Sequence, residues 1–366
     1  MNSNIEELYK KKYLKYKAKY LKLQKGGVYP NTNVGDIIKD KLILLRDYDS
    51  KKIQEKKNNF FKKRISSESW FKNSSESYFE SMAIDYEGNI FVADSRMHMV
   101  HFIKKKECEN KYEIHRSIGT RGSGENQLIS PYGVALDGKG NVVIADTGNH
   151  RIQVFDYNGK HIRTFGSEGN GDGQFQSPCS VAVNKDDKVL VYDKNGRIVV
   201  FNLSNGNYER CMSEVKLGRE GHIILDNEGN VVVSDIENKQ VLVLNFETGA
   251  LKKTFGTTIS KDGKVKKKNF APSCIAFDKD STNIIIIELE IPGSINESYI
   301  KVYNYKTEEY IGYIPFRVRE PPSPSFPNEK PLYSDLLENP HGIVIDKDGQ
   351  IIVNDNTRFV KILELT

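Results

Sequence analysis

The chain has 366 residues, of which 38% are hydrophobic and 28% charged, and this composition is typical of a soluble globular protein. It excludes a disordered chain, and no apolar run reaches the length that crosses a bilayer. The net charge of +5 is uneven, because residues 1–66 contain 18 Lys and Arg against 7 Asp and Glu, whereas residues 67–366 contain 36 against 42. Nucleic-acid affinity depends on neutralising phosphates, so the acidic balance of residues 67–366 argues against nucleic-acid binding there.

Residues 1–27 are predicted to form a basic, amphipathic α-helical tail. Tyrosines recur at steps of three and four residues, Lys fills most other positions, and Gly26-Gly27 ends the segment. The aromatic stripe consists of Tyr9, Tyr13, Tyr16 and Tyr20. Such a tail is either a solvated helix or a docking and localisation handle. It resembles the Tyr/Lys/Leu-rich leader of many otherwise unrelated proteins of mimivirus-like giant DNA viruses, and this resemblance implies a viral protein of the host cytoplasm and a candidate virion component.

Residues 28–58 are predicted to be a linker, with one apolar run at Leu42–Leu45 between charged stretches. The next run, Phe60–Ile65, is strand-like. The chain then continues with strand-like runs to its last one, Phe359–Leu363. We therefore expect residues 59–366 to form one domain.

The stretch Ser130–Phe175 is the clearest repeat unit of that domain. Four short apolar or alternating runs are separated by turns rich in Asp, Asn and Gly, which predicts four strands. The runs are Gly133–Leu136, Val142–Ala145, Arg151–Phe155 and His161–Phe165. A meander of this kind has two apolar faces, so it needs a neighbouring sheet on each side.

The same unit recurs along the chain, marked by a turn Asp or Asn followed nine residues later by Asp. The pairs are Asp85/Asp94, Asp137/Asp146, Asn184/Asp193, Asp226/Asp235 and Asp346/Asp355, with Asp278/Glu288 one residue longer. Four strands per unit and a spacing of roughly 40–50 residues indicate propeller blades. The second member of each pair stands at a strand end before a turn, so we expect Asp94, Asp146, Asp193, Asp235 and Asp355 to brace turns rather than to catalyse.

The segment Asp146–Phe155, DTGNHRIQVF, resembles the core motif of NHL repeats. This resemblance covers about residues 80–366 and implies an all-β fold, a six-bladed NHL-type β-propeller. Asn149, His150 and Arg151 belong to the motif, and we expect them to have structural roles. The final repeat has only three strands, so residues 59–66 are predicted to supply its fourth strand and close the ring.

The residues that precede each first strand should face the axial channel, and among them are Glu80, His222, Cys274 and His341. One Glu and two His make a poor metal site, because Gly, Ser and Cys occupy most other positions. We expect no metal and no cofactor. Cys274 with His222 or His341 could form a nucleophile pair, but buried Cys and channel His are more often packing residues.

A proline-rich insertion, Pro315–Leu337, precedes the final repeat and is a candidate partner-binding loop. The candidate contact residues in it are Pro321, Pro322, Pro324, Phe326 and Tyr333, to which the tyrosine stripe of the tail is added. A plain surface loop is an equal alternative.

Three functions follow from these features. The first is a non-enzymatic protein-interaction scaffold whose tail is a docking or localisation helix. By resemblance, other NHL-type propellers are hydrolases or lyases with a metal in the axial channel, or bind RNA through a basic face, and both alternatives stay open. Four cysteines, Cys108, Cys179, Cys211 and Cys274, lie far apart without a CxxC pair, and no secretory signal is present, so an intracellular location is expected.

Overall fold

The computed structural model describes most of the repeat region. The described residues are 65–66, 77–106, 111–255, 257–259, 265–267, 271–289, 299–315, 340–355 and 360–363. All of them lie in the second of two compact units, Lys57–Thr366. The predicted N-terminal helix with its tyrosine stripe, the linker and the proline-rich loop lie outside the described residues.

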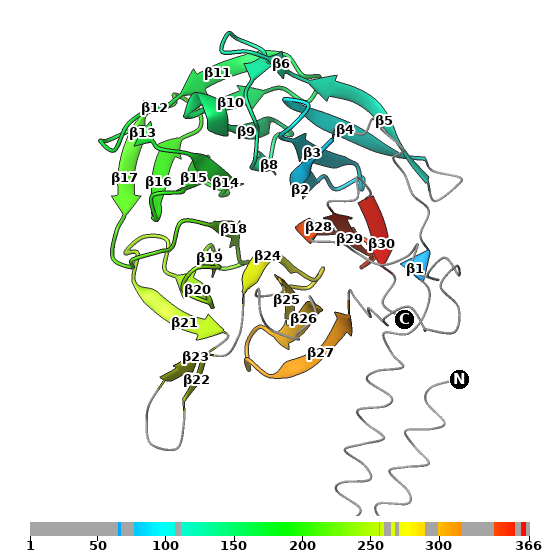
Figure 1. The fold of residues 1–366 in the computed structure, drawn as a ribbon, viewed down its shortest axis with the longest axis vertical. Helices are drawn as coiled ribbons and strands as arrows, with labels where there is room; N and C mark the ends of the chain where they lie inside the picture. The colour runs from blue at the N-terminus through cyan, green and yellow to red at the C-terminus, as the bar shows by residue number, and fades with distance from the viewer. Residues whose placement is uncertain are drawn as a thin grey trace, which may run out of the picture. The chain divides into compact units, whose positions relative to one another are not determined.

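The described residues form an all-β propeller, which confirms this part of the predicted fold class. Apart from one 3-10 helix, Thr147–Asn149, its regular elements are strands that assemble into four-stranded antiparallel sheets around an axis (Figure 1). No helix in these residues is long and apolar enough to cross a membrane.

Five sheets each consist of four strands that follow one another along the chain. The first two are β2 (Phe79–Ile84), β3 (Ile90–Asp94), β4 (Met99–Lys106) and β5 (Lys111–Ile118), then β8 (Val134–Leu136), β9 (Val142–Asp146), β10 (Arg151–Phe155) and β11 (His161–Phe165). The third and fourth are β14 (Pro178–Val183), β15 (Lys188–Asp193), β16 (Arg197–Asn202) and β17 (Tyr208–Met212), then β18 (Gly221–Leu225), β19 (Val231–Asp235), β20 (Gln240–Leu244) and β21 (Leu251–Phe255). The fifth is β24 (Pro272–Phe277), β25 (Asn283–Glu288), β26 (Tyr299–Asn304) and β27 (Tyr310–Pro315).

The prediction of six complete blades is therefore corrected to five. The remaining sheet has only three consecutive strands, β28 (Pro340–Ile345), β29 (Ile351–Asp355) and β30 (Val360–Leu363). Its fourth member is the two-residue strand β1 (Ile65–Ser66), which pairs antiparallel with β30, Ile65 opposite Leu363. Of the predicted closing strand 59–66 only these two residues are described, so closure by the whole segment stays a prediction.

Buried apolar side chains fill the spaces between neighbouring sheets. Second strands such as β9 and β19 are buried along their whole length, since each has a sheet on both sides. The cluster of Phe79, Ile90 and Val92 with Val344 and Ile352 joins the β2–β5 sheet to the β28–β30 sheet. The first strands lie side by side around the axis in the order β2, β8, β14, β18, β24 and β28, and β28 lies again beside β2.

The turn between first and second strands is the same in four sheets. Asp137 Oδ1, for example, accepts hydrogen bonds from the amides of Lys139 at 2.8 Å and Asn141 at 2.7 Å. The residue between these two, Gly140, has a φ of +87°, a conformation that side chains other than glycine rarely adopt. Asp85, Asp226 and Asp346 make the same pair of bonds around Gly88, Gly229 and Gly349. This shared turn explains the nine-residue step seen in the sequence.

Three short two-stranded ladders link the blades. They are the parallel pairs β6 (Thr120–Arg121) with β7 (Gln127–Leu128) and β12 (Ser167–Glu168) with β13 (Gln174–Phe175), and the antiparallel pair β22 (Thr257–Ile259) with β23 (Val265–Lys267). The loops that contain the two parallel pairs, 119–131 and 166–177, are called the linking loops below. Each lies between the fourth strand of one blade and the first strand of the next.

Candidate functional site: the axial cavity

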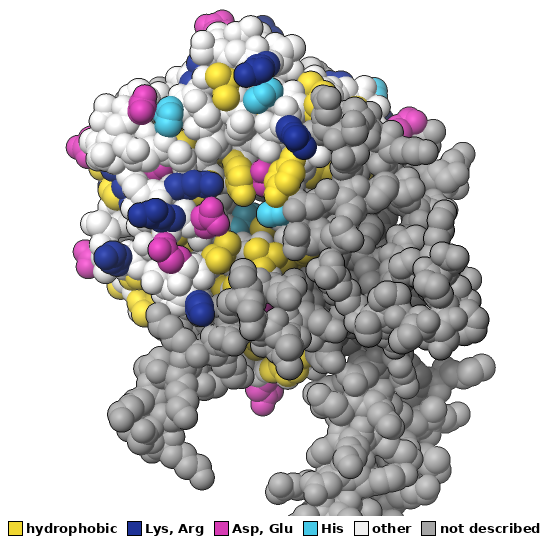
Figure 2. All heavy atoms as spheres, in the orientation of Figure 1, with side chains coloured by type: hydrophobic (Ala, Val, Ile, Leu, Met, Phe, Trp, Pro, Cys, Tyr) yellow, Lys and Arg dark blue, Asp and Glu magenta, His cyan; other side chains and the backbone are white. Residues whose placement is uncertain are grey.

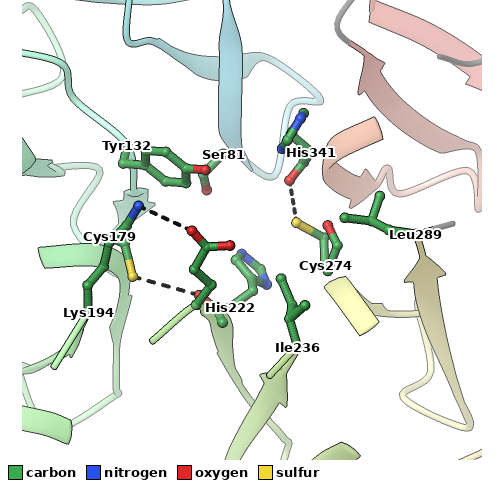
Figure 3. A pocket seen from close by; sticks show the side chains of 12 residues that line it. Ser81, Tyr132, Cys179, Lys194, His222, Ile236, Cys274, Leu289 and His341 are labelled. Carbon is green, nitrogen blue, oxygen red and sulfur yellow. Dashed lines mark hydrogen bonds and ion pairs between the residues drawn. The ribbon is translucent and has the colours of Figure 1, made fainter. Parts of the chain in front are cut away.

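The described residues enclose a cavity of about 80 Å³ at the end of the axis where the first strands begin and the second strands end. Because all first strands start there and second strands end there, residues from or beside all six sheets converge (Figure 3). The lining consists of Ser81, Tyr132, Cys179, Lys194, Glu220, Gly221, His222, Ile236, Ser273, Cys274, Leu289 and His341.

Of the predicted axial residues, the structure brings His222, Cys274 and His341 together in this lining. Glu80, the fourth, is not part of the lining and lies beside it. Its Oε2 atom is 4.0 Å from His341 Nδ1, and its Oε1 atom accepts a hydrogen bond of 2.9 Å from Ser95. The side chain is buried, with 4% of its surface exposed.

Neither axial thiol is arranged as a nucleophile. The Cys274 thiol donates to the backbone carbonyl of His341 rather than to an imidazole, and the Cys179 thiol donates to the carbonyl of Tyr192 at 3.5 Å. Burial raises the pKa of both thiols to about 12. Both cysteines are therefore uncharged near neutral pH and unreactive compared with a thiolate.

The two axial histidines are uncharged as well. Burial lowers the pKa of His222 to about 4, and its Nδ1 atom is shielded from solvent and makes no hydrogen bond with the described residues. Burial also lowers the pKa of His341, whose Nε2 atom lies 3.3 Å from the hydroxyl of Tyr78. The ring nitrogens thus offer neutral hydrogen-bonding positions instead of positive charge.

Glu80 has the opposite behaviour, because its burial raises its pKa to about 7. The hydroxyls of Ser95 and Tyr132 and the charge of Lys194 offset only part of this cost of burial. Its Oε2 atom is shielded from solvent and faces His341 Nδ1 at 4.0 Å. The carboxyl group therefore exchanges its proton in the neutral range, beside the cavity.

A lysine and a glutamate stand at the mouth of the cavity. Lys194 Nζ lies 3.7 Å from Glu220 Oε1 and 4.9 Å from the centre of the Tyr132 ring. The side chain of Glu220 is 61% exposed and that of Lys194 34% exposed, so the pair faces solvent on one side. Neither residue was predicted from the sequence. Lys194 could have been found, because it directly follows the repeated strand-end carboxylate, as do the lining residues Ile236 and Leu289.

Among the described residues, no group of three or more His, Cys, Asp and Glu side chains is placed to hold a metal ion. The cavity combines two neutral imidazoles, two neutral thiols, two serines and the Lys194–Glu220 pair. Its lining can donate and accept hydrogen bonds around a small polar group.

The repeated strand-end carboxylates do not line the cavity, and they hold the fold together. Asp146 is fully buried and accepts from the backbone amide of Ile129 at 2.8 Å, from Asn149 at 2.8 Å and from Arg151 Nε at 2.7 Å. In three other sheets the carboxylate likewise accepts a hydrogen bond from a backbone amide 16 or 17 residues upstream. These pairs are Asp94 with Tyr78, Asp193 with Ser177 and Asp235 with Gly218. Each carboxylate thus ties a second strand to the segment leading into its first strand. The side chain of Asp355 lies outside the described residues.

The motif arginine and its equivalent in the next blade fix the linking loops. The guanidinium of Arg151 donates to the carbonyls of Ser123, Gly124 and Gln127, and that of Arg197 donates to those of Asn170 and Gln174. His150 has a φ of +53° and its Nδ1 atom contacts the carbonyl of Gln176. The loop tips stay exposed, and they carry both signs of charge. The exposed charged residues are Arg121, Glu125, Glu168 and Asp172.

Figure 2 shows the side of the molecule drawn in Figure 1, where basic, acidic and hydrophobic side chains are interspersed around histidines near the axis. The candidate contact residues of the proline-rich loop and of the tail, Pro321 to Tyr333 and Tyr9 to Tyr20, lie outside the described residues.

Comparison with known proteins places an NHL repeat at residues 128–155, which includes β8, β9 and β10. Over 50 residues the chain is 50% identical to the B-box type zinc finger protein ncl-1 of Caenorhabditis elegans, covering 14% of this chain and 6% of that protein. Over 153 residues it is 27% identical to the protein brain tumor of Drosophila melanogaster, covering 41% of this chain and 15% of that protein. The matches thus span a small part of these curated relatives.

Solved structures show the same fold at low sequence identity. A streptogramin B lyase superimposes with a TM-score of 0.55 and 12% identity, over 82% of this chain and 97% of that one. Hydrazine synthase of Kuenenia stuttgartiensis gives a TM-score of 0.52 and 11% identity, over 77% and 74%. The chain therefore contains an NHL repeat, at residues 128–155, within a β-propeller fold.

Proposed function

We propose that this chain is a non-enzymatic protein-interaction scaffold that binds its partner through the linking loops. The observation that carries the proposal is the fixing of both loops by an arginine from the neighbouring blade. Arg151 and Arg197 bind loop carbonyls and leave the tips exposed. A surface that is already ordered loses little conformational entropy when a partner binds, so more of the contact energy contributes to affinity.

The charge of the loop tips favours a protein over a nucleic acid. One tip carries Arg121 and Glu125, and the other carries Glu168 and Asp172 without a basic residue. A phosphate backbone requires a basic surface, whereas a protein partner can complement mixed charge. The RNA-binding alternative therefore ranks below the scaffold. The hydrolase or lyase alternative lacks support from the cavity, where the thiols are protonated and tied to backbone carbonyls.

The test is affinity purification from producing cells, followed by mass spectrometry, with wild-type protein and two double variants. The first variant, Glu168→Arg with Asp172→Arg, reverses the charge of one loop tip. The matched control, Asp186→Arg with Asp280→Arg, makes the same change of charge in exposed turns at the other end of the first strands. We expect a discrete protein that wild type and control retain and the loop variant loses. Equal retention by all three, or RNA as the only retained molecule, would contradict the scaffold role.

We further propose that residues 1–27 localise the scaffold inside the cell, in a viral host cytoplasm or a virion as their resemblance suggests. A fusion of residues 1–27 to a fluorescent protein tests this. A diffuse distribution, identical to that of the fluorescent protein alone, would refute the localisation role.

A further inference from the structure

We propose that the axial cavity binds a slender alkyl chain that ends in a primary ammonium group, as a lysine side chain does. The inference adds a ligand chemistry to the proposed scaffold. It does not depend on the linking loops, because a free alkylamine would fit the same cavity.

The charge around the cavity favours a cation. The cavity and its surroundings contain two carboxyl groups, those of Glu80 and Glu220, and one ammonium group, that of Lys194. Lys194 is already paired with Glu220. The imidazoles of His222 and His341 and both thiols are neutral, so they add no positive charge. Above neutral pH the field in the cavity is therefore negative, which attracts a cation and repels an anion.

Unused hydrogen-bonding positions match an ammonium group. The Nδ1 atom of His222, which lines the cavity, is buried and makes no hydrogen bond with the described residues, and the carboxyl group of Glu80 beside the cavity can accept a further hydrogen bond besides those from Ser95 and Tyr132. An ammonium group has three donors and no acceptor, so it needs several acceptors close together. A buried polar atom without a partner is costly, and a ligand that supplies the missing donor removes that cost.

The walls suit the methylene groups of such a ligand. Ile236, Leu289 and the thiols of Cys179 and Cys274 form the less polar part of the lining (Figure 3). The mouth already holds an ammonium over an aromatic ring, Lys194 above Tyr132 at 4.9 Å. A cavity that binds benzene has a volume of roughly 150 Å³. This cavity, at about 80 Å³, is too small for a ring and admits only a thin chain.

Lys194 allows the sign of the ligand's charge to be tested, because the positive charge of Lys194 weakens the binding of a cation and would strengthen the binding of an anion. Removing it with Lys194→Met should strengthen ammonium binding. Removing the opposite charge with Glu220→Gln should weaken it. Both residues are partly exposed, so each change should be about two- to fivefold, the range of solvent-exposed ion pairs. An anion-binding cavity would respond in the opposite direction to both variants.

Glu80 should couple binding to pH. The groups that face it are Ser95 and Tyr132, the positive charge of Lys194, the negative charge of Asp94, and His341. A bound cation favours the ionised carboxylate, so affinity should be higher at pH 8 than at pH 6 and binding should release a proton. Glu80→Gln should remove this pH dependence and weaken binding at pH 8 by about tenfold, as expected for a lost hydrogen bond to a charged group.

The experiment is isothermal titration calorimetry of the full chain with n-butylammonium chloride, Nα-acetyl-lysine amide, and sodium butyrate and n-butanol as charge controls. Buffers with different ionisation enthalpies report the proton release. The variants Lys252→Met and Glu228→Gln are matched controls, since this Lys–Glu pair, 3.4 Å apart, lies on the outer strand and a turn of the β18–β21 sheet. Circular dichroism establishes that every variant is folded.

We expect saturable binding of butylammonium, no binding of butyrate or butanol, opposite effects of Lys194→Met and Glu220→Gln, and no effect of the two controls. Binding of the lysine amide as well assigns the site to a protein side chain, and its exclusion assigns it to a free amine. Butyrate binding, equal effects of the control pair, or no saturation by any amine would overturn the inference. None of these results depends on whether the linking loops bind a partner.

Discussion

Replacing Asp146 with Asn tests whether the repeated strand-end carboxylate holds the blade together. The carboxylate is fully buried and accepts four hydrogen bonds, from the amide of Ile129, from Asn149, from Arg151 and from Gln153, at 2.7–3.0 Å. An amide group at this position turns a donor toward other donors and leaves the guanidinium without its counter-charge. Breaking one partner of a buried ion pair costs about 3–5 kcal/mol. That is a large fraction of the roughly 5–15 kcal/mol that stabilises a typical domain.

The assay is urea unfolding followed by circular dichroism, with Asp156→Asn as the control. Asp156 also accepts two hydrogen bonds, from the amides of Asn158 and Lys160 at 2.9 and 2.8 Å, but in a turn on the surface. We expect the control to lose at most about 1 kcal/mol, the range of an ordinary hydrogen bond. Equal losses in the two variants would show that burial and the arginine add nothing, and would refute the reasoning.

Three further predictions concern ring closure and pH. Lys105→Met should lower the free energy of unfolding by about 1–3 kcal/mol. The reason is that the buried carboxylate of Asp346, 3.1 Å away in the β28–β30 sheet, loses its cation. Thermal unfolding checks this, and an unchanged Tm would contradict it. Glu80 has a pKa of about 7 in the folded protein, above the ordinary value of 4.5, so its contribution to stability is present below pH 4.5 and lost as the pH rises through 7. Relative to Glu80→Gln, the wild type should lose about 3 kcal/mol between pH 4.5 and pH 8, measured by urea unfolding; parallel pH profiles would exclude this. Deleting residues 1–66 should cause aggregation through two open sheet edges, whereas deleting residues 1–27 should not. Light scattering measures the aggregation of both deletion variants. Equal scattering by the two would refute closure of the ring by residues 59–66.

The blades could be predicted from the sequence because two local signals coincide. Short apolar runs fix the strands, and the Asp of the first turn forms the same two amide bonds in four sheets, which produces the nine-residue step. The hydrogen bond from the amide of Ile129 to Asp146 could not be predicted. Nothing in the spacing of 17 residues shows that the linking loop folds back onto the strand end. The predicted count of six blades was wrong, since the last sheet has only three consecutive strands and only two residues of its fourth strand, Ile65 and Ser66, are described.

The axial site could be predicted in part. His222, Cys274 and His341 were found because they begin first strands, and the start of a first strand must face the axis of a propeller. Glu220 and Lys194 were missed, since they stand just outside strands, where the direction of a side chain depends on the tertiary fold. The burial that shifts the pKa of Glu80 to about 7 is likewise invisible in the sequence.

The pairing of β1 with β30 also has a consequence for folding. Strands of the five complete blades pair with neighbours close in sequence, so each blade can form on the ribosome soon after its residues emerge. Ile65 lies 298 residues before its partner Leu363, so it is synthesised long before that partner exists. Such a long-range contact is slow to form, and the unpaired edges are prone to associate with other chains until it does. We therefore expect the final sheet to form late. The yield of folded protein should depend on how long its strand edges stay unpaired.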